Sequence, residues 1–303
     1  MTRQCTLENT ICATGVGLHT GQKVNLLLRP ADPNTGIVFR RIDFEEPVEI
    51  LAAVENIVDS TMSTVLGKGK VTVSNVEPLL AAFAGMGIDN AFVDVNAAEV
   101  PAMDGSAGPF VFLIQSAGIK AQDALRQYIR IKKTVSLGEG EERGQLSPCN
   151  EYKLTYLRTY HSSSQGSNSK KIQIILSPVI FQREISRARS FSFARDEEML
   201  QNKTQSNNGR RDKVVSNDDY RVQDANGLRY ADEFLRHQLL NTIGQLYIIG
   251  HRLLGEYIGH QMSHKMNTDL LRALLEDDSA WELVPADTQS DVPDSSRRAV
   301  VAL

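Results

Sequence analysis

Hydrophobic and polar residues alternate with a period of two in the first third of the chain. This alternation is typical of β-strands that bury one face, and short polar segments with glycine, proline or asparagine separate the runs. A Gly-Lys-Gly sequence inside the last run favours a hairpin. We therefore predict a small sheet whose strands lie within residues 10–21, 23–30, 36–42 and 63–75.

The spacing of apolar positions then changes to three and four residues, which is typical of amphipathic helices. Residues 76–87 and 106–118 follow this spacing and end at glycines, and residues 89–97 between them alternate as a strand does. The pattern predicts a sheet that is followed by a helix, a strand and a second helix.

The rest of the chain repeats this order. Strand patterns precede a long amphipathic helix at 231–247, a strand at 251–262 and a helix at 267–277. The repetition indicates an internal duplication and an α+β fold of two domains, each a small β-sheet packed against two α-helices. The preceding strands are predicted at 128–137, 151–160, 171–177 and 182–193, the last with a loop as the alternative.

We place the first domain at residues 1–124, the second at 125–283 and a flexible C-terminal tail at 284–303. The tail is polar, acidic and interrupted by proline, so it is not expected to join the fold. Residues 120–127 are expected to link the domains. The polar segment 202–217 is interpreted as a solvated surface loop, with a functional loop as the alternative.

The composition of the 303-residue chain is that of a globular protein, with 41% hydrophobic and 23% charged residues. A net charge of −4 argues against binding to nucleic acid or to an anionic membrane. Three cysteines without short spacing indicate neither a disulfide framework nor a thiolate zinc site, so we expect a reducing cytoplasm. No apolar run reaches the roughly 18 residues of a transmembrane segment, and we see no signal peptide.

Histidines supply the candidate chemistry. His237 and Asn241 lie one helical turn apart, the spacing at which a helix presents paired metal ligands, although asparagine is a poor partner for histidine at a metal. His260 and His264 are also four residues apart, but they fall where a strand is predicted to end. Glycines surround His19, where a plain turn is the simpler interpretation.

Seven motifs occur in order along roughly residues 1–283: ATGVGLHTG, NTGIVFRR, GIDNAFVDVNAAEVPAMDGSAGPFV, ISRARSF, DDYRV, GLRYADEFLRH and SHKMNTDLL. Together they closely resemble the UDP-3-O-acyl-N-acetylglucosamine deacetylase family of lipid A biosynthesis in Gram-negative bacteria. The resemblance implies the same duplicated fold and a catalytic zinc held by two histidines and one aspartate. Such a ligand set leaves an open position for the water that attacks the acetyl group.

The chain departs from this family at the implied ligand positions. The Val-Glu-His signature of the first helix reads Val76-Glu77-Pro78, and proline has no lone pair to donate. The His-x-x-x-Asp of the second helix reads His237 and Asn241, so His237 is the only ligand retained. One imidazole and a weak amide oxygen leave most of the coordination shell to water, so no zinc cofactor is expected unless the site is rebuilt.

The resemblance also assigns roles to other residues. It makes Glu77 the remnant of the general base and His264 the remnant of the catalytic histidine. It replaces a lysine near the nucleotide diphosphate by Gln238, and an aspartate that pairs with the catalytic histidine by Gln245. The residues implied to line the substrate site are His19, Ser190, Phe191, Asp196 and Gln238.

Three interpretations are weighed. The favoured one is a catalytically inactive homologue that binds or regulates, with the active deacetylase, another lipid A pathway protein or a UDP-sugar as its partner. The second is an active deacetylase whose rebuilt metal site uses His237 with His264 or His260. In the third, Glu77 and His264 act as an acid–base pair without a metal.

Overall fold

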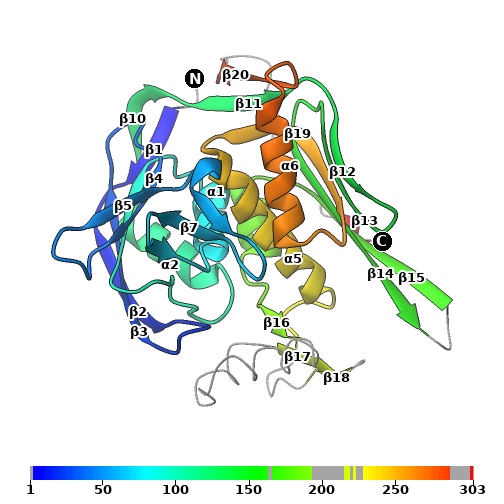
Figure 1. Ribbon diagram of the computed structural model, residues 1–303, viewed down its shortest axis with the longest axis horizontal. Helices are drawn as coiled ribbons and strands as arrows, with labels where there is room; N and C mark the ends of the chain where they lie inside the picture. The colour runs from blue at the N-terminus through cyan, green and yellow to red at the C-terminus, as the bar shows by residue number, and fades with distance from the viewer. Residues whose placement is uncertain are drawn as a thin grey trace.

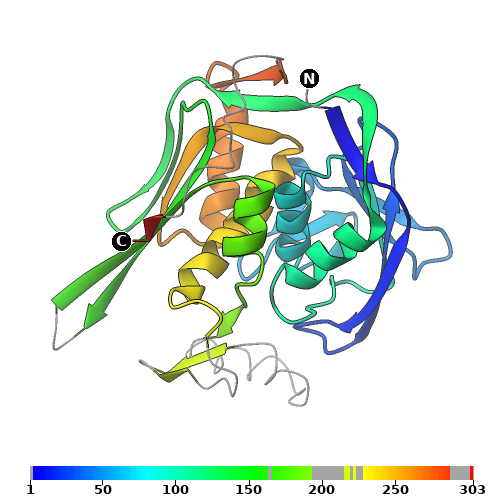
Figure 2. The same cartoon turned by 180° about the vertical axis from the view of Figure 1, so that it is seen from behind.

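The computed structural model describes residues 3–162, 166–192, 215–218, 221–222, 228–286 and 301–302. Two sheet systems lie on opposite sides of a central group of helices (Figure 1). The large sheet of the first half lies on one side of these helices and that of the second half lies on the other, as the view from behind also shows (Figure 2). The α+β fold class is confirmed.

The first half contains a five-stranded sheet, a small three-stranded sheet and two helices, as the alternation of its residues predicts. The large sheet has the order β2(Ile11–Val16), β3(Lys23–Pro30), β9(Ala91–Val95), β4(Ile37–Arg41), β5(Val48–Leu51). The small sheet consists of β6(Ile57–Asp59), β7(Val65–Lys68) and β8(Val71–Val73), with the 3-10 turn η1(Val54–Asn56) before it. The helices are α1(Glu77–Met86) and α2(Gly108–Ala117).

The second half is built on an eight-stranded sheet. Its main path has the order β12(Val135–Glu139), β13(Glu142–Ser147), β19(Arg252–His260), β14(Tyr152–Ser162), β15(Gly166–Ile175), β21(Val301–Ala302). Off this path, β11(Gln127–Ile131) pairs with β19 and with β20(Trp281–Pro285). The helices are α5(Glu233–Leu246), which continues into η3(Tyr247–Ile249), and α6(His264–Glu276). Short strands β16(Phe191–Ser192), β17(Val215–Asp218) and β18(Arg221–Val222) form a separate sheet.

The strand predicted at 182–193 is wrong over most of its length. Residues 182–185 instead belong to the π-helical turn η2(Phe181–Ile185), which continues the helical turn α3(Pro178–Ile180). Residues 186–190 form a loop, as the alternative prediction had it, and only Phe191 and Ser192 are in a strand. The Ser177 hydroxyl accepts a hydrogen bond from the Ile180 amide and Pro178 lies in the first turn, so both residues favour helix initiation. These signals lie before the segment whose alternation suggested a strand.

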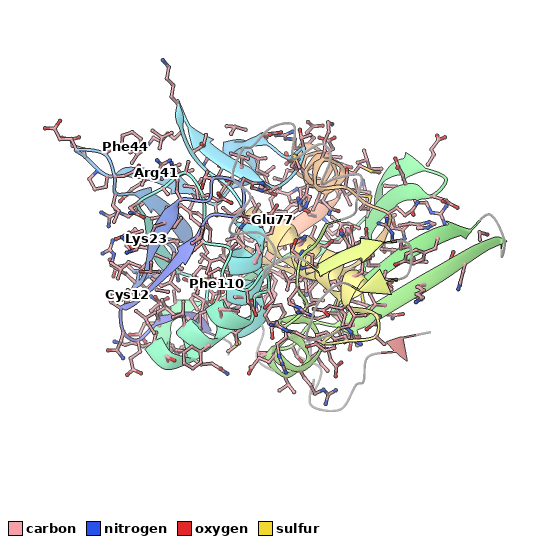
Figure 3. The ribbon with its side chains drawn as sticks, turned by 90° about the horizontal axis from the view of Figure 1, so that it is seen from below. Cys12, Lys23, Arg41, Phe44, Glu77 and Phe110 are labelled. Atoms are coloured by element: carbon pink, nitrogen blue, oxygen red, sulfur yellow. The ribbon has the colours of Figure 1, made fainter. Side chains whose placement is uncertain are left out.

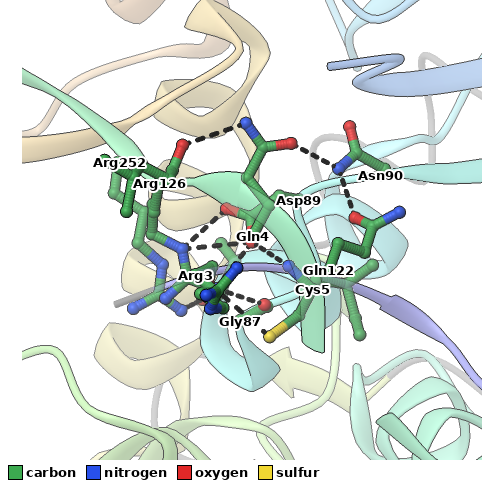
Figure 4. Close-up of polar contacts among 12 residues, drawn as sticks. Arg3, Gln4, Cys5, Gly87, Asp89, Asn90, Gln122, Arg126 and Arg252 are labelled. Carbon is green, nitrogen blue, oxygen red and sulfur yellow. Dashed lines mark hydrogen bonds and ion pairs between the residues drawn. The ribbon is translucent and has the colours of Figure 1, made fainter. Parts of the chain in front are cut away.

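Most of the segment 120–127, which was predicted to link the halves, forms a strand that the sequence did not predict, β10(Ile119–Leu125), which pairs with β1(Arg3–Leu7). Figure 4 shows how this joint is held: the Asn90 amide donates to Gln4 Oε1 at 2.8 Å and to Gln122 Oε1 at 2.7 Å. Beside it, Arg126 and Asp89 form an ion pair at 2.6 Å. The segment between the halves is thus a strand fixed by buried polar contacts.

The predicted tail begins too early. Val284 and Pro285 belong to β20, where they pair with Tyr128 and Gln127 of β11, so the ordered fold extends past position 283. Most of 287–303 and of the loop 202–217 lies outside the described residues, and there the structure gives only the backbone of β17 and β21. The division into domains at 124 and 125 stays a prediction.

The buried apolar side chains of both halves form one continuous core. Every residue of α1 is buried, and α1 packs against α5 from the other half. At this contact Gly244 of α5 lies so close to the Glu77 carbonyl that an added Cβ would stand 2.1 Å from its oxygen. The fold therefore brings the N-terminus of α1 directly against α5. Among the described helices none is both long and apolar enough to cross a bilayer.

Candidate active site

Glu77 and His264 meet between the two halves, although 187 positions separate them in the chain. Glu77 opens α1 and His264 opens α6, where the Ser263 hydroxyl caps the helix by accepting from the Met266 amide. His264 Nδ1 lies 3.0 Å from Glu77 Oε1, an ion-pair distance without full hydrogen-bond alignment. Figure 3 shows Glu77 near the middle of the molecule, beside the helices of the second half.

The Glu77 carboxyl is almost completely buried, with 1% of the residue exposed. Burial by itself raises its pKa, but the neighbouring His264 imidazole and the backbone N–H of Thr64 outweigh burial, and the pKa of Glu77 lies below its ordinary value. Glu77 is therefore ionised at neutral pH and has the charge state of a general base. The side chain of His264 is 23% exposed, so the pair is open on the histidine side.

His237 lies on the α5 face that points toward this pair. Its Nδ1 is 3.1 Å from the Ala188 carbonyl oxygen, which can only accept, so Nδ1 carries the proton and donates. Its Nε2 is 3.1 Å from Nδ2 of Asn241, one turn further along α5. Burial lowers the pKa of His237 to about 4, so the imidazole is neutral at physiological pH.

Pro78 occupies the first turn of α1, where its fixed φ and missing N–H are tolerated. It is buried and brings no donor atom to the site. No cluster of three His, Cys, Asp or Glu side chains that could hold a metal ion occurs in the part of the chain that the structure describes. The zinc ion that the resemblance implies thus does not fit the donor set of the described residues.

The rebuilt metal site considered from the sequence would need His260 or His264 beside His237. His260 ends β19, where its Nε2 lies 2.8 Å from the hydroxyl of Thr159 on β14, so it belongs to the sheet. The four-residue spacing of His260 and His264 spans a strand end and a helix start, so it has no helical geometry. Within the described residues, these histidines do not assemble a metal centre.

Gln245 does not contact the imidazole of His264. Its Nε2 donates to the Thr64 hydroxyl at 3.1 Å and to the backbone carbonyl of His264 at 3.2 Å. Its Oε1 accepts from Asn267 at 2.9 Å, and the Asn267 oxygen accepts from the Tyr257 hydroxyl at 2.7 Å. Sequence reasoning missed Thr64 and Asn267, because a threonine in a loop and an asparagine in a helix have no distinctive pattern.

The residues implied to line the substrate site come from several elements of the fold. The backbone of His19 donates to the buried carboxylate of Glu99 at 2.9 Å, which holds the turn between β2 and β3. The Ser190 amide donates to the Gly105 carbonyl at 2.9 Å. Gln238 is half-buried on α5. The side chain of Phe191 and all of Asp196 lie outside the described residues.

Comparison with known proteins gives a family. The sequence profile of the family UDP-3-O-acyl N-acetylglycosamine deacetylase (LpxC) matches residues 4–276. The UDP-3-O-acyl-N-acetylglucosamine deacetylase of Methylococcus capsulatus is 48% identical over 302 residues, which cover 100% of this chain and 99% of the relative. The protein of the same name from Nitrosococcus oceani is 49% identical over 94% of this chain and 93% of the relative. That of Alcanivorax borkumensis is 45% identical over 100% and 99%.

These relatives overturn the favoured interpretation of the sequence. The chain was expected not to be an enzyme, because Pro78 and Asn241 replace implied zinc ligands. Relatives of 45–49% identity along nearly the whole chain are named as the deacetylase, which points to an enzyme, so that expectation is wrong. With the family profile over residues 4–276 and full-length relatives of this name, the chain belongs to the UDP-3-O-acyl-N-acetylglucosamine deacetylase family.

Proposed function

We propose that the protein hydrolyses the acetamide of an acylated UDP-sugar of the UDP-3-O-acyl-N-acetylglucosamine type. Two observations support this function. Full-length relatives carry the name of that deacetylase. A buried carboxylate and a partly exposed histidine lie 3.0 Å apart where the two halves meet, so one point of the site holds both a group that can accept a proton and a group that can donate one. The second observation carries the proposal, because it concerns the atoms of this chain.

The proposed reaction uses Glu77 as the base and His264 as the acid. Glu77 accepts a proton from water while the water oxygen bonds to the acetyl carbon, and the carbonyl oxygen becomes an oxyanion. The oxyanion then re-forms the carbonyl and the C–N bond breaks as protonated His264 donates a proton to the nitrogen, which leaves as a free amine. Nδ1 of His264 faces Glu77, so Nε2 is the nitrogen available for this transfer. The other product is acetic acid, which ionises to acetate in solution, and the proton held by Glu77 passes to His264 to restore the pair.

Asn241 is the residue that we assign to the acetyl oxygen. One Nδ2 hydrogen points to His237, and the rest of the carboxamide has no partner among the described residues, although the side chain is only half-buried. A hydrogen-bond donor aimed at a developing oxyanion typically contributes about 10²–10³ in kcat. No step is assigned to zinc, because Pro78 and Asn241 remove two of the three implied ligands.

The test is a deacetylation assay with the purified full-length protein and UDP-3-O-acyl-N-acetylglucosamine, in which free amine and acetate are measured. We expect turnover, and we expect Glu77→Gln to lower kcat by about 10²–10⁴ with little change in KM, because the amide cannot accept the proton. The control is Glu55→Gln, which removes an exposed carboxylate of η1 outside the site. Absence of acetate release by the folded wild-type protein would refute the proposed function.

A further inference from the structure

The pairing of His237 with Asn241 determines what the α5 face of the site can bind. The Ala188 carbonyl fixes the proton on Nδ1 of His237, so Nε2 presents a lone pair. Asn241 meets this lone pair with an N–H at 3.1 Å. We infer that this hydrogen-bonded pair stands in place of a metal centre, and that the protein works without a stoichiometric zinc ion.

In the pair of His237 and Asn241, a hydrogen-bond donor faces an acceptor. An aspartate at position 241 would place a carboxylate oxygen opposite the lone pair of His237, and two facing acceptors are stable only with a cation or a proton between them. The carboxamide supplies its own hydrogen at that place. Turning the amide so that its oxygen faced His237 would recreate the mismatch. A zinc ion must therefore break an existing hydrogen bond before it reaches Nε2.

The opposing helix α1 supplies no ligand at the position where the family implies one. Its first turn holds Pro78 there, whose ring is buried and has no donor atom. The two helices are also in close contact here, since the Glu77 carbonyl fills the place of a side chain at Gly244. With His237 as the one ligand kept of the three implied positions, and no cluster of three metal-binding side chains among the described residues, a zinc ion would keep mostly water in its coordination shell.

One consequence of the inference, that deacetylation needs no zinc, rests on the proposed function. The zinc content itself is measured without any activity assay. The full-length protein is equilibrated with zinc, freed of unbound metal and submitted to elemental analysis. We expect a zinc content far below one ion per chain, and no rise in melting temperature when zinc is added. In the same samples, a chelator should leave deacetylation unchanged.

Three variants test the cause. N241D restores the pair of facing acceptors and should bind zinc weakly, and P78H/N241D should bind stoichiometric zinc and melt higher with zinc than without. Asn150→Asp, at an exposed position between β13 and β14, is the charge-matched control and should bind no more zinc than wild type. If the folded double variant bound no zinc, Pro78 and Asn241 would not be what excludes the metal, and the inference would fail.

Stoichiometric zinc in wild type that disappears in His237→Ala would overturn the inference directly, since adventitious zinc would survive that change. The outcome is separable from that of the proposed function. A protein without zinc and without deacetylase activity would contradict the proposed function and agree with the metal-free site. A protein with stoichiometric zinc and deacetylase activity would agree with the proposed function and contradict the metal-free site.

Discussion

Glu233 and Arg189 form a buried ion pair next to the site. The carboxylate accepts from the Arg189 backbone N–H at 3.0 Å and from its guanidinium at 2.8 Å and 3.1 Å, and it also accepts from the Arg229 backbone at 2.7 Å. Neither side chain is more than 8% exposed. The pair holds the chain just after Ala188, whose carbonyl orients His237. A contact outside the site thus sets the tautomer inside it.

Glu233→Gln is expected to destabilise the protein at neutral pH by about 3–5 kcal/mol, because the buried Arg189 charge loses its partner. Burial raises the pKa of Glu233, but the hydrogen bonds and charge of Arg189 outweigh burial and bring it below its ordinary value of 4.5. A depressed pKa stabilises the fold above 4.5, and this stabilisation is lost as the pH falls through the folded-state pKa. The measurement is urea unfolding of both proteins from neutral pH to well below 4.5.

The wild-type and variant free energies of unfolding should converge as the solution is acidified. Glu282→Gln, in an ion pair whose side chains are 37% and 41% exposed, is the control and should change stability little at any pH. A difference that stayed constant down the acid range would mean that the Glu233 carboxylate does not ionise more readily in the fold.

The contact between α1 and α5 is the packing element on which the site depends. Gly244 lets the two helices approach until backbone meets backbone at Glu77, which places the base beside α6. Near the opposite end of α1, Gly85 allows a similar approach by the ring of Phe181, where an added Cβ would also stand 2.1 Å away. The two glycines relieve equal crowding, but only one of them borders the site.

Gly244→Ala should therefore lower both stability and activity. The new methyl group would push α5 away from the Glu77 backbone, at a cost of about 1–3 kcal/mol for overpacking, and would shift the carboxylate from His264. Gly85→Ala, the matched control, should cost similar stability and leave kcat largely unchanged. Melting curves and deacetylation kinetics of both variants check this. Equal losses of kcat would show that the effect follows from general destabilisation.

The molecule as a whole has one core that includes both halves. Cross-contacts reinforce it: the Tyr247 hydroxyl bonds to the Ile88 carbonyl, and Arg252 donates to the Ala84 carbonyl at 2.6 Å. Because the site lies on this shared boundary, its geometry requires both halves to be folded. Repeated sheet-and-helix units need not unfold separately when their helices share a core.

We expect a single cooperative unfolding transition. Trp281, the only tryptophan, lies on β20 of the second half and reports on that half by fluorescence, while circular dichroism reports on all helices. Phe83→Ala, in α1 of the first half, should lower the midpoint seen by both probes, with a cost of about 3–5 kcal/mol for the cavity. If the Trp281 signal kept its wild-type midpoint in this variant, the halves would unfold independently.

Local patterns predicted much of the fold. Among the described residues, the four long helices lie where the apolar spacing placed them, although α6 begins three residues earlier than the predicted 267, because Ser263 caps it. The error at 182–193 and the strand missed at 120–127 both arise from information outside the segment itself. Alternation over a few residues does not reveal that a preceding cap starts a helix, and a linker sequence does not reveal that a distant strand such as β1 pairs with it.

Within the site, the sequence alone determined the side-chain chemistry: position 78 has no metal-binding atom in its side chain, and position 241 carries an amide. It also determined that His237 and Asn241 lie one helical turn apart. The inactive protein inferred from those atoms was wrong, because a count of lost ligands does not say what the remaining residues do, and the relatives point to an enzyme. The resemblance had already paired Glu77 with His264, but only the tertiary structure gave their 3.0 Å separation and placed Thr64, Ala188 and Gln245 near the site. Such contacts form because helices from distant parts of the chain pack into one core. A pattern of a few neighbouring residues does not determine how far apart two such helices lie.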